Sequence, residues 1–419
     1  MSLSPRVEEW KRSWAVAISA MLGVSFVAVP LYSIGAFLLP LEAEFGWSRT
    51  SISAGLTIET FVAAILLPIG GMMVDRFGPR RVALPGVLLF GGALALLSLT
   101  DASLPVWFFL WFLVGFACVL GGAHIWVVGV SSSFDHGRGL AIAVALSGPS
   151  MAAAISPPIA TFYIDQFGWR AAYVGLALTW IVMIFPLAFL AFRTPADRKM
   201  PSEATGTPAQ ALTGLDLREG IRSRPFIIIF FAAIAITLGG VPFAVMMIPI
   251  LKEGGIPVAK AAELGVLLGI SSVTGRITVG YLLDRFPANI IGGMSCLLPI
   301  VSCLTLILFS GSVPAATVAI VALGLSLGAE YDAAAYLTGR HLGLKRFGTF
   351  YSFIGGAISI SVGLGTMLLS YIYDVTGSYI LGLWVGIPLA ALGATLFFSL
   401  SASPRWKNIP GAQAAAFSG

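Results

Sequence analysis

Long apolar stretches separated by short polar segments follow one another along almost the whole chain. A helix needs about 20 apolar residues to cross the hydrocarbon core of a bilayer. The pattern predicts twelve such helices, near residues 14–40, 51–74, 82–100, 104–133, 139–163, 169–192, 226–251, 261–283, 288–310, 313–338, 347–372 and 378–402. A membrane β-barrel would instead show short segments of alternating polarity. We therefore expect an all-α membrane protein.

Composition strengthens this prediction. Hydrophobic residues make up 58% of the chain and charged residues only 10%, whereas soluble domains have about 25% charged residues. Residues 1–13 are charged and the first apolar stretch is too long for a secretory signal, so it is expected to remain as the first membrane helix. The three cysteines fall inside predicted spans, without the spacing of a disulfide framework or a zinc site. No nucleotide-binding loop or nucleophile motif is present, so we expect no enzyme activity, catalytic residue, metal or cofactor.

The positive charges predict how the chain is oriented. With an even number of spans, both termini and every second loop lie on one side of the membrane. Of the 24 Lys and Arg residues, the opposite side has only Arg49, Arg170, Lys252 and Lys260. The positive-inside rule then places both termini in the cytoplasm, in a multi-pass protein of the plasma (inner) membrane. The net charge of +5 follows from this loop bias and is no reason to expect nucleic-acid binding.

The two halves of the chain resemble each other at an offset of 209 residues. The segment "GGMMVDRFGPRR" begins at Gly70, and "VGYLLDRFPANI" begins at Val279. The same offset aligns three further pairs, which are Pro40 with Pro249, Glu44 with Glu253, and Asp165 with Asp374. We expect an N-terminal six-helix bundle in 1–192, a cytoplasmic linker in 193–225 and a C-terminal six-helix bundle in 226–419. Parallel repeats of this kind are typical of alternating-access transporters.

At these residues the chain resembles a known family. The pattern G-x-x-x-D-R-F-G-x-R-R, which begins at Gly71, resembles the signature of the major facilitator superfamily, and a degenerate copy lies between the eighth and ninth spans. The resemblance implies two six-helix bundles with pseudo-two-fold symmetry and a substrate site between them at the membrane midplane.

Two further segments are similar to the monocarboxylate transporter and oxalate–formate exchanger branch. They are "FDHGRGLAIAVALSGPS" at 134–150 and "GRITVGYLLDRF" from Gly275. The branch has a carboxylate-binding arginine on its eighth span, and by this match the role falls on Arg276. The chain departs from the animal transporters at Ser272, where they have Asp, and after Pro30, where they have Lys. These departures put the proton relay of that branch in doubt.

Arg276 is the one Lys or Arg that this count assigns to neither side of the membrane, because it lies in the middle of an apolar stretch. A charge near the bilayer centre costs at least about 2.5–3.5 kcal/mol. Arg276 lies eight residues before Asp284, which places it roughly 12 Å from the cytoplasmic end of its helix. The planar guanidinium suits a carboxylate, so Arg276 is expected to bind an organic anion. A single cation favours a monocarboxylate, because a second negative charge would be left unpaired. The alternative is a structural ion pair between helices.

Four further residues inside spans are candidates for proton coupling or gating. Asp332 lies at the depth of Arg276, so it is expected to pair with it, either as a proton carrier or as a structural salt bridge. Glu330 lies on a different helix face, with packing as its other explanation. Glu59 lies near the middle of the second span, and His124 lies at a depth similar to that of Asp332. For both, a structural role is the alternative.

Tyrosine hydroxyls are candidate substrate contacts, because a phenol donates a hydrogen bond while its ring stays in apolar surroundings. We select Tyr32 and Tyr336 for this role, and Tyr331 and Tyr351 lie on spans that are also expected to face the cavity. For Tyr331, Tyr336 and Tyr351, plain packing is the alternative and the favoured explanation. A further set is expected to hold one conformational state through contacts between helix ends: Gly71, Asp75, Arg76, Arg80, Arg138, Asp284 and Arg285.

The sequence therefore predicts a monomeric secondary transporter for a small organic anion, most simply a monocarboxylate, with membrane lipid around it and protons as the coupling ion. An organic-anion exchanger without proton coupling is the alternative. An exporter of hydrophobic cations would show buried acids without a buried arginine, and a receptor that no longer transports would carry an added soluble domain.

Overall fold

The computed structural model describes residues 5–134, 137–197, 214–343 and 346–401. Within these residues the chain is helical almost throughout, and the only β pairing is an isolated bridge between Gly214 and Gly343. The α-helices are α1 (Pro5–Val27), α2 (Val29–Phe45), α3 (Arg49–Phe77), α4 (Pro79–Leu96), α5 (Leu104–Gly121), α6 (Ala123–Ser133), α7 (Arg138–Leu146), α8 (Gly148–Ala191), α9 (Leu217–Ile221), α10 (Arg224–Val245), α11 (Met247–Glu253), α12 (Val258–Arg285), α13 (Ala288–Ser295), α14 (Leu298–Leu308), α15 (Val313–Leu342), α16 (Phe347–Thr376) and α17 (Ile380–Phe398). Two short 3₁₀ helices, η1 (Leu97–Leu99) and η2 (Pro195–Asp197), complete the set.

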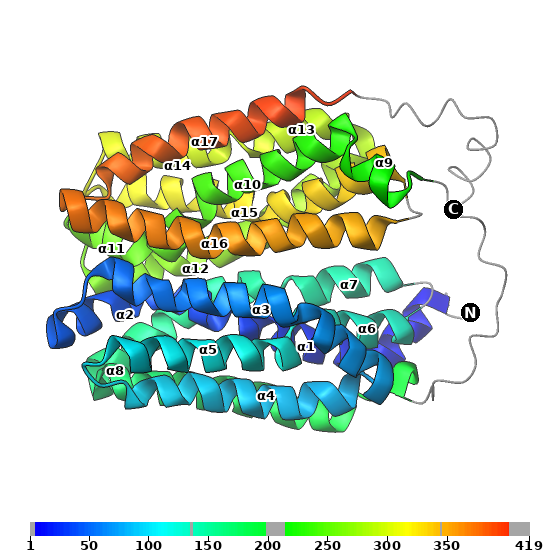
Figure 1. The fold of residues 1–419 in the computed structure, drawn as a ribbon, viewed down its shortest axis with the longest axis horizontal. Coiled ribbons are helices and arrows are strands. Elements are labelled where there is room, and N and C mark those ends of the chain that lie inside the picture. The colour runs from blue at the N-terminus through cyan, green and yellow to red at the C-terminus, as the bar shows by residue number, and fades with distance from the viewer. Residues whose placement is uncertain (1–4, 135–136, 198–213, 344–345, 402–419) are drawn as a thin grey trace.

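Figure 1 shows two bundles side by side, α1–α8 in one and α10–α17 in the other. We call the end where α1 begins and α17 ends the proximal end, and the opposite end the distal end. Large apolar side chains such as Ile65, Val182 and Ile277 are exposed along the outer helices. In water such a surface would be costly, so it is the surface expected to face lipid.

Eleven helical segments among the described residues are long and apolar enough to cross a membrane. One of them, Leu140–Ala191, is 52 residues long and is interrupted at Gly168, where φ is 82° and ψ is 164°. Only glycine adopts such a backbone conformation without strain. The segment therefore contains two spans, and the twelve predicted spans are all present.

Prolines break several of these spans. Ala28 separates α1 from α2 just before Pro30, Ser147 separates α7 from α8 just before Pro149, and Leu297 precedes Pro299 at the start of α14. Proline has no N–H and its ring clashes with the carbonyl one turn earlier, so the helix bends at the preceding residues.

The sequence repeat reappears as equivalent contacts at the distal end. Glu44 accepts hydrogen bonds from Trp169 Nε1 at 2.5 Å and from Arg170 Nη1 at 2.6 Å. Its counterpart Glu253 accepts hydrogen bonds from Ser378 Oγ and from the Tyr379 backbone N–H, and these two residues lie 209 positions after Trp169 and Arg170. Each bundle thus joins its first and sixth spans in the same way, as two copies of one design do.

The predicted linker is attached to both bundles. Asp197 accepts a hydrogen bond from the Arg80 backbone N–H at 2.9 Å, at the start of α4. At the other end of the linker, the Leu215 N–H donates to the Leu342 carbonyl oxygen at 2.9 Å. Residues 198–213 lie outside the described part, and the domain boundaries remain a prediction.

Candidate functional site

Close packing of α12 on α15 brings the predicted pair together. A Cβ added at Gly328 would lie 1.9 Å from the Ser272 carbonyl oxygen, and one at Gly275 would lie 2.3 Å from the Leu325 carbonyl oxygen. Glycine at these positions lets the two backbones approach. Arg276 follows Gly275 directly, and Asp332 follows Gly328 by one turn, so both side chains leave the backbone where the helices are closest.

Arg276 and Asp332 form an ion pair, as their matching depths predict. Arg276 Nη1 donates to Asp332 Oδ1 at 3.2 Å. The two side chains are 15% and 30% exposed, although they lie midway along their helices. Among the described residues, Asp332 is the one hydrogen-bond partner of the guanidinium, and Arg276 Nε is buried without any. A guanidinium has five N–H donors, so most of this one's binding capacity is unused.

Two tyrosines from different bundles surround the pair. Tyr32 of α2, in the N-terminal bundle, is close enough to interact electrostatically with Arg276 and Glu330. Tyr351 of α16 interacts electrostatically with Asp332 and Arg276. Ser272, one turn before Arg276 on α12, shares a hydrogen bond of 2.8 Å with Ser150 of α8, so α12 meets the N-terminal bundle one turn away from the ion pair. Sequence reasoning selected Tyr32 and ranked Tyr351 lower, because nothing in the sequence fixes which face of α16 turns toward α12.

The structure places Tyr336 differently. Its hydroxyl accepts a hydrogen bond from Arg340 Nη1 at 3.5 Å, one turn closer to the proximal end than Asp332. Among the described contacts, Tyr336 and Arg276 have no neighbour in common. A contact between Tyr336 and the substrate therefore remains a prediction.

Glu330 lies two residues before Asp332 and points to another helix, as predicted. Its side chain is buried, and its Oε1 accepts a hydrogen bond from the Thr237 hydroxyl of α10. No ion pair to Glu330 occurs among the described residues. The two acids of α15 thus have different partners. Asp332 pairs with a cation, and Glu330 is bonded to a neutral hydroxyl.

Glu59 and His124 both lie within the N-terminal bundle, and no described contact joins either of them to the ion pair. A Cβ added at Gly115 of α5 would lie 3.0 Å from the Glu59 Cα, so Glu59 packs at the α3–α5 contact. His124 lies against Gly70 of α3, and its Nε2 is buried without a hydrogen-bond partner. The described contacts do not bring His124 to Asp332. Proton coupling by either residue remains a prediction.

The proximal motif residues are only partly within the described structure. Arg80 donates to the carbonyl oxygens of Phe189 and Phe192 at 2.6 and 3.3 Å, which are at the C-terminal end of α8. This is the helix-end contact that was expected. Arg76 and Arg285 are exposed and lie over the rings of Phe77 and Tyr281. A side chain at Gly71 would meet open space. The side chains of Asp75, Arg138 and Asp284 lie outside the described residues, and the conformational role of the set is untested.

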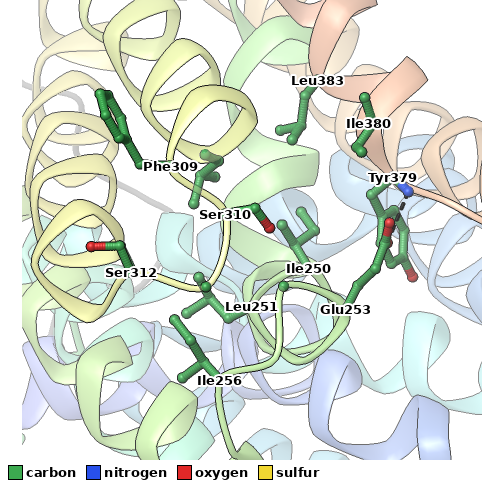
Figure 2. Close-up of a pocket in the computed structure, with 14 residues that line it drawn as sticks. Ile250, Leu251, Glu253, Ile256, Phe309, Ser310, Ser312, Tyr379, Ile380 and Leu383 are labelled. Atoms are coloured by element: carbon green, nitrogen blue, oxygen red, sulfur yellow. Dashed lines mark hydrogen bonds between the residues drawn. The ribbon is translucent and has the colours of Figure 1, made fainter.

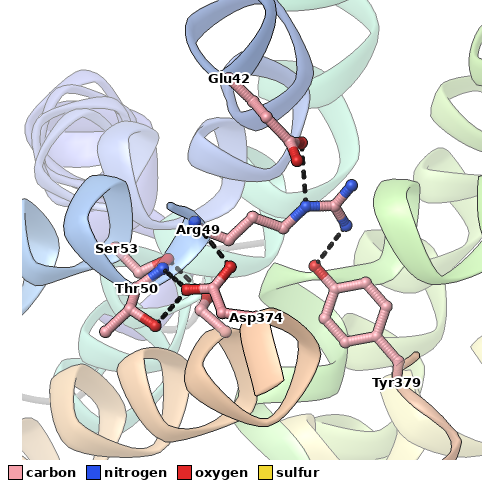
Figure 3. A network of polar contacts seen from close by, with 7 residues as sticks. Glu42, Arg49, Thr50, Ser53, Asp374 and Tyr379 are labelled. Carbon is pink, nitrogen blue, oxygen red and sulfur yellow. Dashed lines mark hydrogen bonds and ion pairs between the residues drawn. The ribbon is translucent and has the colours of Figure 1, made fainter. Parts of the chain in front are cut away.

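A second polar cluster, at the distal end, joins the two bundles (Figure 3). The Asp374 carboxylate at the end of α16 accepts hydrogen bonds from the backbone N–H groups of Arg49 and Thr50 at 3.0 and 2.8 Å, and from the Thr50 hydroxyl. These N–H groups are the first of α3 and have no partner within the helix. A carboxylate at a helix N-terminus is also favoured by the helix dipole. We call this cluster the distal latch.

The Arg49 side chain completes the distal latch. Its Nε donates to Glu42 Oε2 at 3.1 Å, its Nη1 donates to the Tyr379 hydroxyl at 2.9 Å, and its guanidinium lies 3.6 Å from the ring centroid of Tyr373. Burial raises the pKa of Tyr379, and the Arg49 guanidinium opposes that rise. Two features of the sequence pointed to this cluster, a cation on the distal side and the repeated Asp374, but no pattern in the sequence places them next to each other.

A small cavity of about 120 Å³ lies behind the distal latch in the C-terminal bundle (Figure 2). Most of its lining is apolar, with Ile250, Leu306 and Leu383 among the residues. Glu253 also lines it, but its carboxylate is already bonded to Ser378 and Tyr379. Tyr379 reaches from this cavity to Arg49, so the cavity positions a latch residue and offers no cation to an anionic substrate.

Further along the same crossing, α3 and α16 are joined by neutral groups. Ser53 and Ser370 share a hydrogen bond of 2.7 Å, and the Thr57 hydroxyl donates to the Gly363 carbonyl oxygen at 2.9 Å. The equivalent crossing of α8 and α12 has one such bond, between Ser150 and Ser272 at 2.8 Å. All described hydrogen bonds between the bundles lie between the middle of the helices and the distal end.

Two six-helix bundles that meet around a polar centre are typical of membrane transport proteins. The chain belongs to the Major Facilitator Superfamily, whose sequence pattern matches residues 16–354. It is therefore a multi-pass membrane transporter and not an enzyme.

Individual proteins of known name are also similar to this chain. Monocarboxylate transporter 13 of Bos taurus is 25% identical over 371 residues, covering 87% of this chain and 84% of that protein. The oxalate:formate antiporter of Oxalobacter formigenes is 24% identical over 246 residues, covering 56% of this chain and 55% of that protein. The crystal structure of a bacterial homolog of the human lysosomal transporter Spinster aligns with a TM-score of 0.65 at 17% identity, covering 95% of this chain and 97% of that one. The last likeness concerns the fold alone.

Proposed function

We propose that the protein is a secondary active transporter for a small monocarboxylate, which it moves by alternating access together with a proton. The observation that carries this proposal is the state of Arg276, a partly buried guanidinium that makes one hydrogen bond among the described residues and so leaves four of its five donors without a described partner. The similarity to a monocarboxylate transporter supports the substrate class. The substrate carboxylate binds Arg276, with Tyr32 as a hydroxyl donor from the opposite bundle.

The conformation supports alternating access. By the positive-inside rule the proximal end is cytoplasmic, in the plasma (inner) membrane. The described hydrogen bonds between the bundles lie on the distal side, where the distal latch joins α3 to α16. The protein is thus closed toward the outside in this state, and transport requires the latch to open. It acts as a monomer, because each chain holds both bundles.

Exchange of organic anions without proton coupling is the second candidate. The observation that favours it is the similarity to the oxalate:formate antiporter. An exchanger needs Arg276 but no proton carrier, so the two functions differ in what drives net uptake.

Uptake into proteoliposomes tests both functions. Purified protein is reconstituted, and uptake of labelled formate, L-lactate and benzoate is followed with an acidic exterior, with and without a protonophore. Proton symport predicts saturable uptake that a protonophore abolishes. Uptake that depends only on preloaded anion would assign the exchanger instead. The absence of uptake of every anion under both conditions would contradict the proposal.

A further inference from the structure

The two halves of the repeat differ at the distal end in how one carboxylate is neutralised. In the N-terminal bundle, Arg170 Nη1 donates to Glu44 Oε1 at 2.6 Å, and its Nη2 donates to the Thr100 carbonyl oxygen at 3.2 Å. The Arg170 guanidinium also lies 5.7 Å from the ring centroid of Phe45. A cation of the chain itself thus fills the space between a carboxylate, a carbonyl oxygen and an aromatic ring.

The C-terminal bundle has the carboxylate without such a cation. The offset of 209 residues places Glu253, Phe309 and Tyr379 at the positions of that acid, that carbonyl group and that arginine. All three line the cavity of about 120 Å³ in Figure 2, which we call the distal cavity. The Tyr379 hydroxyl is turned to Arg49 of the other bundle. Among the described residues Glu253 forms no ion pair, and its partners are the Ser378 hydroxyl and the Tyr379 backbone N–H.

Aromatic rings fill the same region of the N-terminal bundle. The ring centroids of Phe45 and Trp47 are 4.6 Å apart, and those of Trp47 and Trp107 are 5.8 Å apart. The residues at the corresponding positions of the C-terminal bundle are smaller, and all of them line the distal cavity: Gly254, Ile256 and Ala316. The distal cavity therefore corresponds to space that a guanidinium and aromatic rings occupy in the first half of the repeat.

The size and polarity of the distal cavity define the kind of molecule that fits it. Leu251 and Leu383 in its wall are buried, whereas Glu253 and Phe309 are exposed. An apolar group therefore fits inside, with a charged group at the exposed carboxylate. The volume of about 120 Å³ approaches the roughly 150 Å³ of an apolar protein cavity that binds benzene, so there is room for one ring or a short alkyl chain. A carboxylate bonds a cationic N–H donor more strongly than a neutral one.

No cation of the chain competes for Glu253 among the described contacts. Lys260 pairs with Glu263 at 2.9 Å, and Lys252 does not line the distal cavity. Arg49 is bonded within the distal latch. The acid therefore lies beside an apolar hollow without the positive charge that its counterpart in the first half has.

We propose that the distal cavity binds a small organic cation, in which an ammonium or amidinium group is attached to one ring or to a short alkyl chain. The cationic group bonds the Glu253 carboxylate as Arg170 bonds Glu44, and the apolar part lies against Leu251 and Leu383. The ligand enters from the distal end, where the connections between α11 and α12 and between α14 and α15 border the cavity. This site is separate from the anion site, and it does not depend on which substrate is transported.

Binding is measured on the purified full-length protein, from the rise in melting temperature with increasing concentration of benzylamine or benzamidine. Both cations should stabilise the wild type in a saturable way, and benzyl alcohol, which has the same ring without the charge, should bind less tightly. Glu253→Gln keeps the size of the side chain and removes its charge, so the affinity for both cations should fall about tenfold or more. Glu44→Gln is the matched control and should keep the wild-type affinity, because Arg170 already fills its side of the repeat.

Ala316→Leu tests the position of the ligand without changing any charge. The larger side chain fills part of the distal cavity, so both cations should bind more weakly. The proposal is overturned by wild-type affinity in Glu253→Gln or in Ala316→Leu, by an equal loss in Glu44→Gln, or by benzyl alcohol that binds as tightly as benzylamine. If Glu253→Gln does not fold, Glu253→Asp takes its place and must bind benzylamine more weakly than the wild type. None of these measurements involves anion transport, so their failure leaves the proposed function standing.

Discussion

Two buried arginines, Arg49 and Arg276, differ in how far their donors are used. Arg49 is 5% exposed, bonds Glu42 and Tyr379, and stacks on Tyr373 at 3.6 Å. Arg276 makes one bond of 3.2 Å to an acid that is itself 30% exposed. Among the described contacts, Arg49 uses two of its five N–H donors and one face of its guanidinium, whereas Arg276 uses one donor and neither face, so Arg276 keeps the larger capacity for a ligand. Burial of a charge inside a membrane protein therefore does not by itself mark a substrate site.

The two arginines also lie at contacts of different kinds. Arg49 and Asp374 join the bundles at the distal end, where α3 meets α16. Arg276 and Asp332 belong to one bundle and join α12 to α15. Changes at Arg49 should therefore alter the balance between conformations, and changes at Arg276 should alter recognition.

The largest expected effect is the loss of anion binding in Arg276→Ala. Hydrogen bonds to charged groups contribute about 1.5–3 kcal/mol each, so affinity should fall by about 100-fold. Arg276→Lys keeps the charge but loses the planar fork and should be intermediate. Isothermal titration of the purified variants with the transported anion measures this. Equal affinity in all three proteins would remove Arg276 from the site.

The next effect concerns the distal latch. Asp374→Ala removes the acceptor of two helix N-terminal N–H groups and should shift the equilibrium toward distal opening by about tenfold, for a loss of about 1.5 kcal/mol. Its matched control is Asp165→Ala, because Asp165 is the exposed counterpart of Asp374 in the repeat. Accessibility of a single cysteine placed at Ser53 to a membrane-impermeant reagent reports the opening. The same labelling rate in both variants would reject the latch, and anion affinity should change little in either.

A smaller effect is expected from Tyr32→Phe. One neutral hydrogen bond contributes about 0.5–1.5 kcal/mol, which corresponds to a fall in anion affinity of about two- to tenfold. Tyr336→Phe should have less effect, because that hydroxyl is bonded to Arg340. The KM for uptake of both variants decides this. A larger change in Tyr336→Phe than in Tyr32→Phe would reverse the assignment.

The smallest effect is expected from a substitution that adds a hydrogen bond between the bundles and leaves Arg276 unchanged. Among the described residues, the buried hydroxyl of Thr161 has no hydrogen-bond partner. By the repeat, Thr161 corresponds to Ser370 and Ala262 to Ser53, and these two serines share a hydrogen bond. Ala262→Ser should supply the missing partner and stabilise the closed state by about 1 kcal/mol or less. A slightly higher melting temperature and slightly slower uptake are expected. Ala262→Val adds size without a donor, and an equal rise in that variant would show that the hydroxyl is not the cause.

Much of the fold could be predicted from the sequence, because span length, charge bias and the repeat each limit it strongly. The repeat aligns Glu44 with Glu253, and both acids make the same kind of contact. The pairing of Arg276 with Asp332 could also be predicted, since Arg276 lies eight residues before Asp284 and Asp332 lies eight residues before Arg340, which gives them similar depths. The break at Gly168 and the bends before Pro30 follow from local backbone chemistry.

The remaining contacts depend on how distant segments face each other. Asp374 meets Arg49 across 325 positions, and Thr237 meets Glu330 across 93. Hydrophobic periodicity is nearly absent in spans that are apolar on all sides, so the sequence does not show which face turns inward. For the same reason the sequence does not show that His124 lies against Gly70.

Ligand-dependent thermal stability of purified wild type and Arg276→Ala tests the central claim most directly. Formate, L-lactate, benzoate, oxalate and succinate are compared with a sugar and an organic cation at equal ionic strength. A ligand present at 100 times its Kd stabilises the folded state by about 2.7 kcal/mol. We predict that a monocarboxylate raises the melting temperature of the wild type and leaves that of Arg276→Ala unchanged. Equal stabilisation of both proteins, or stabilisation of the wild type only by the cation or the sugar, would contradict the account.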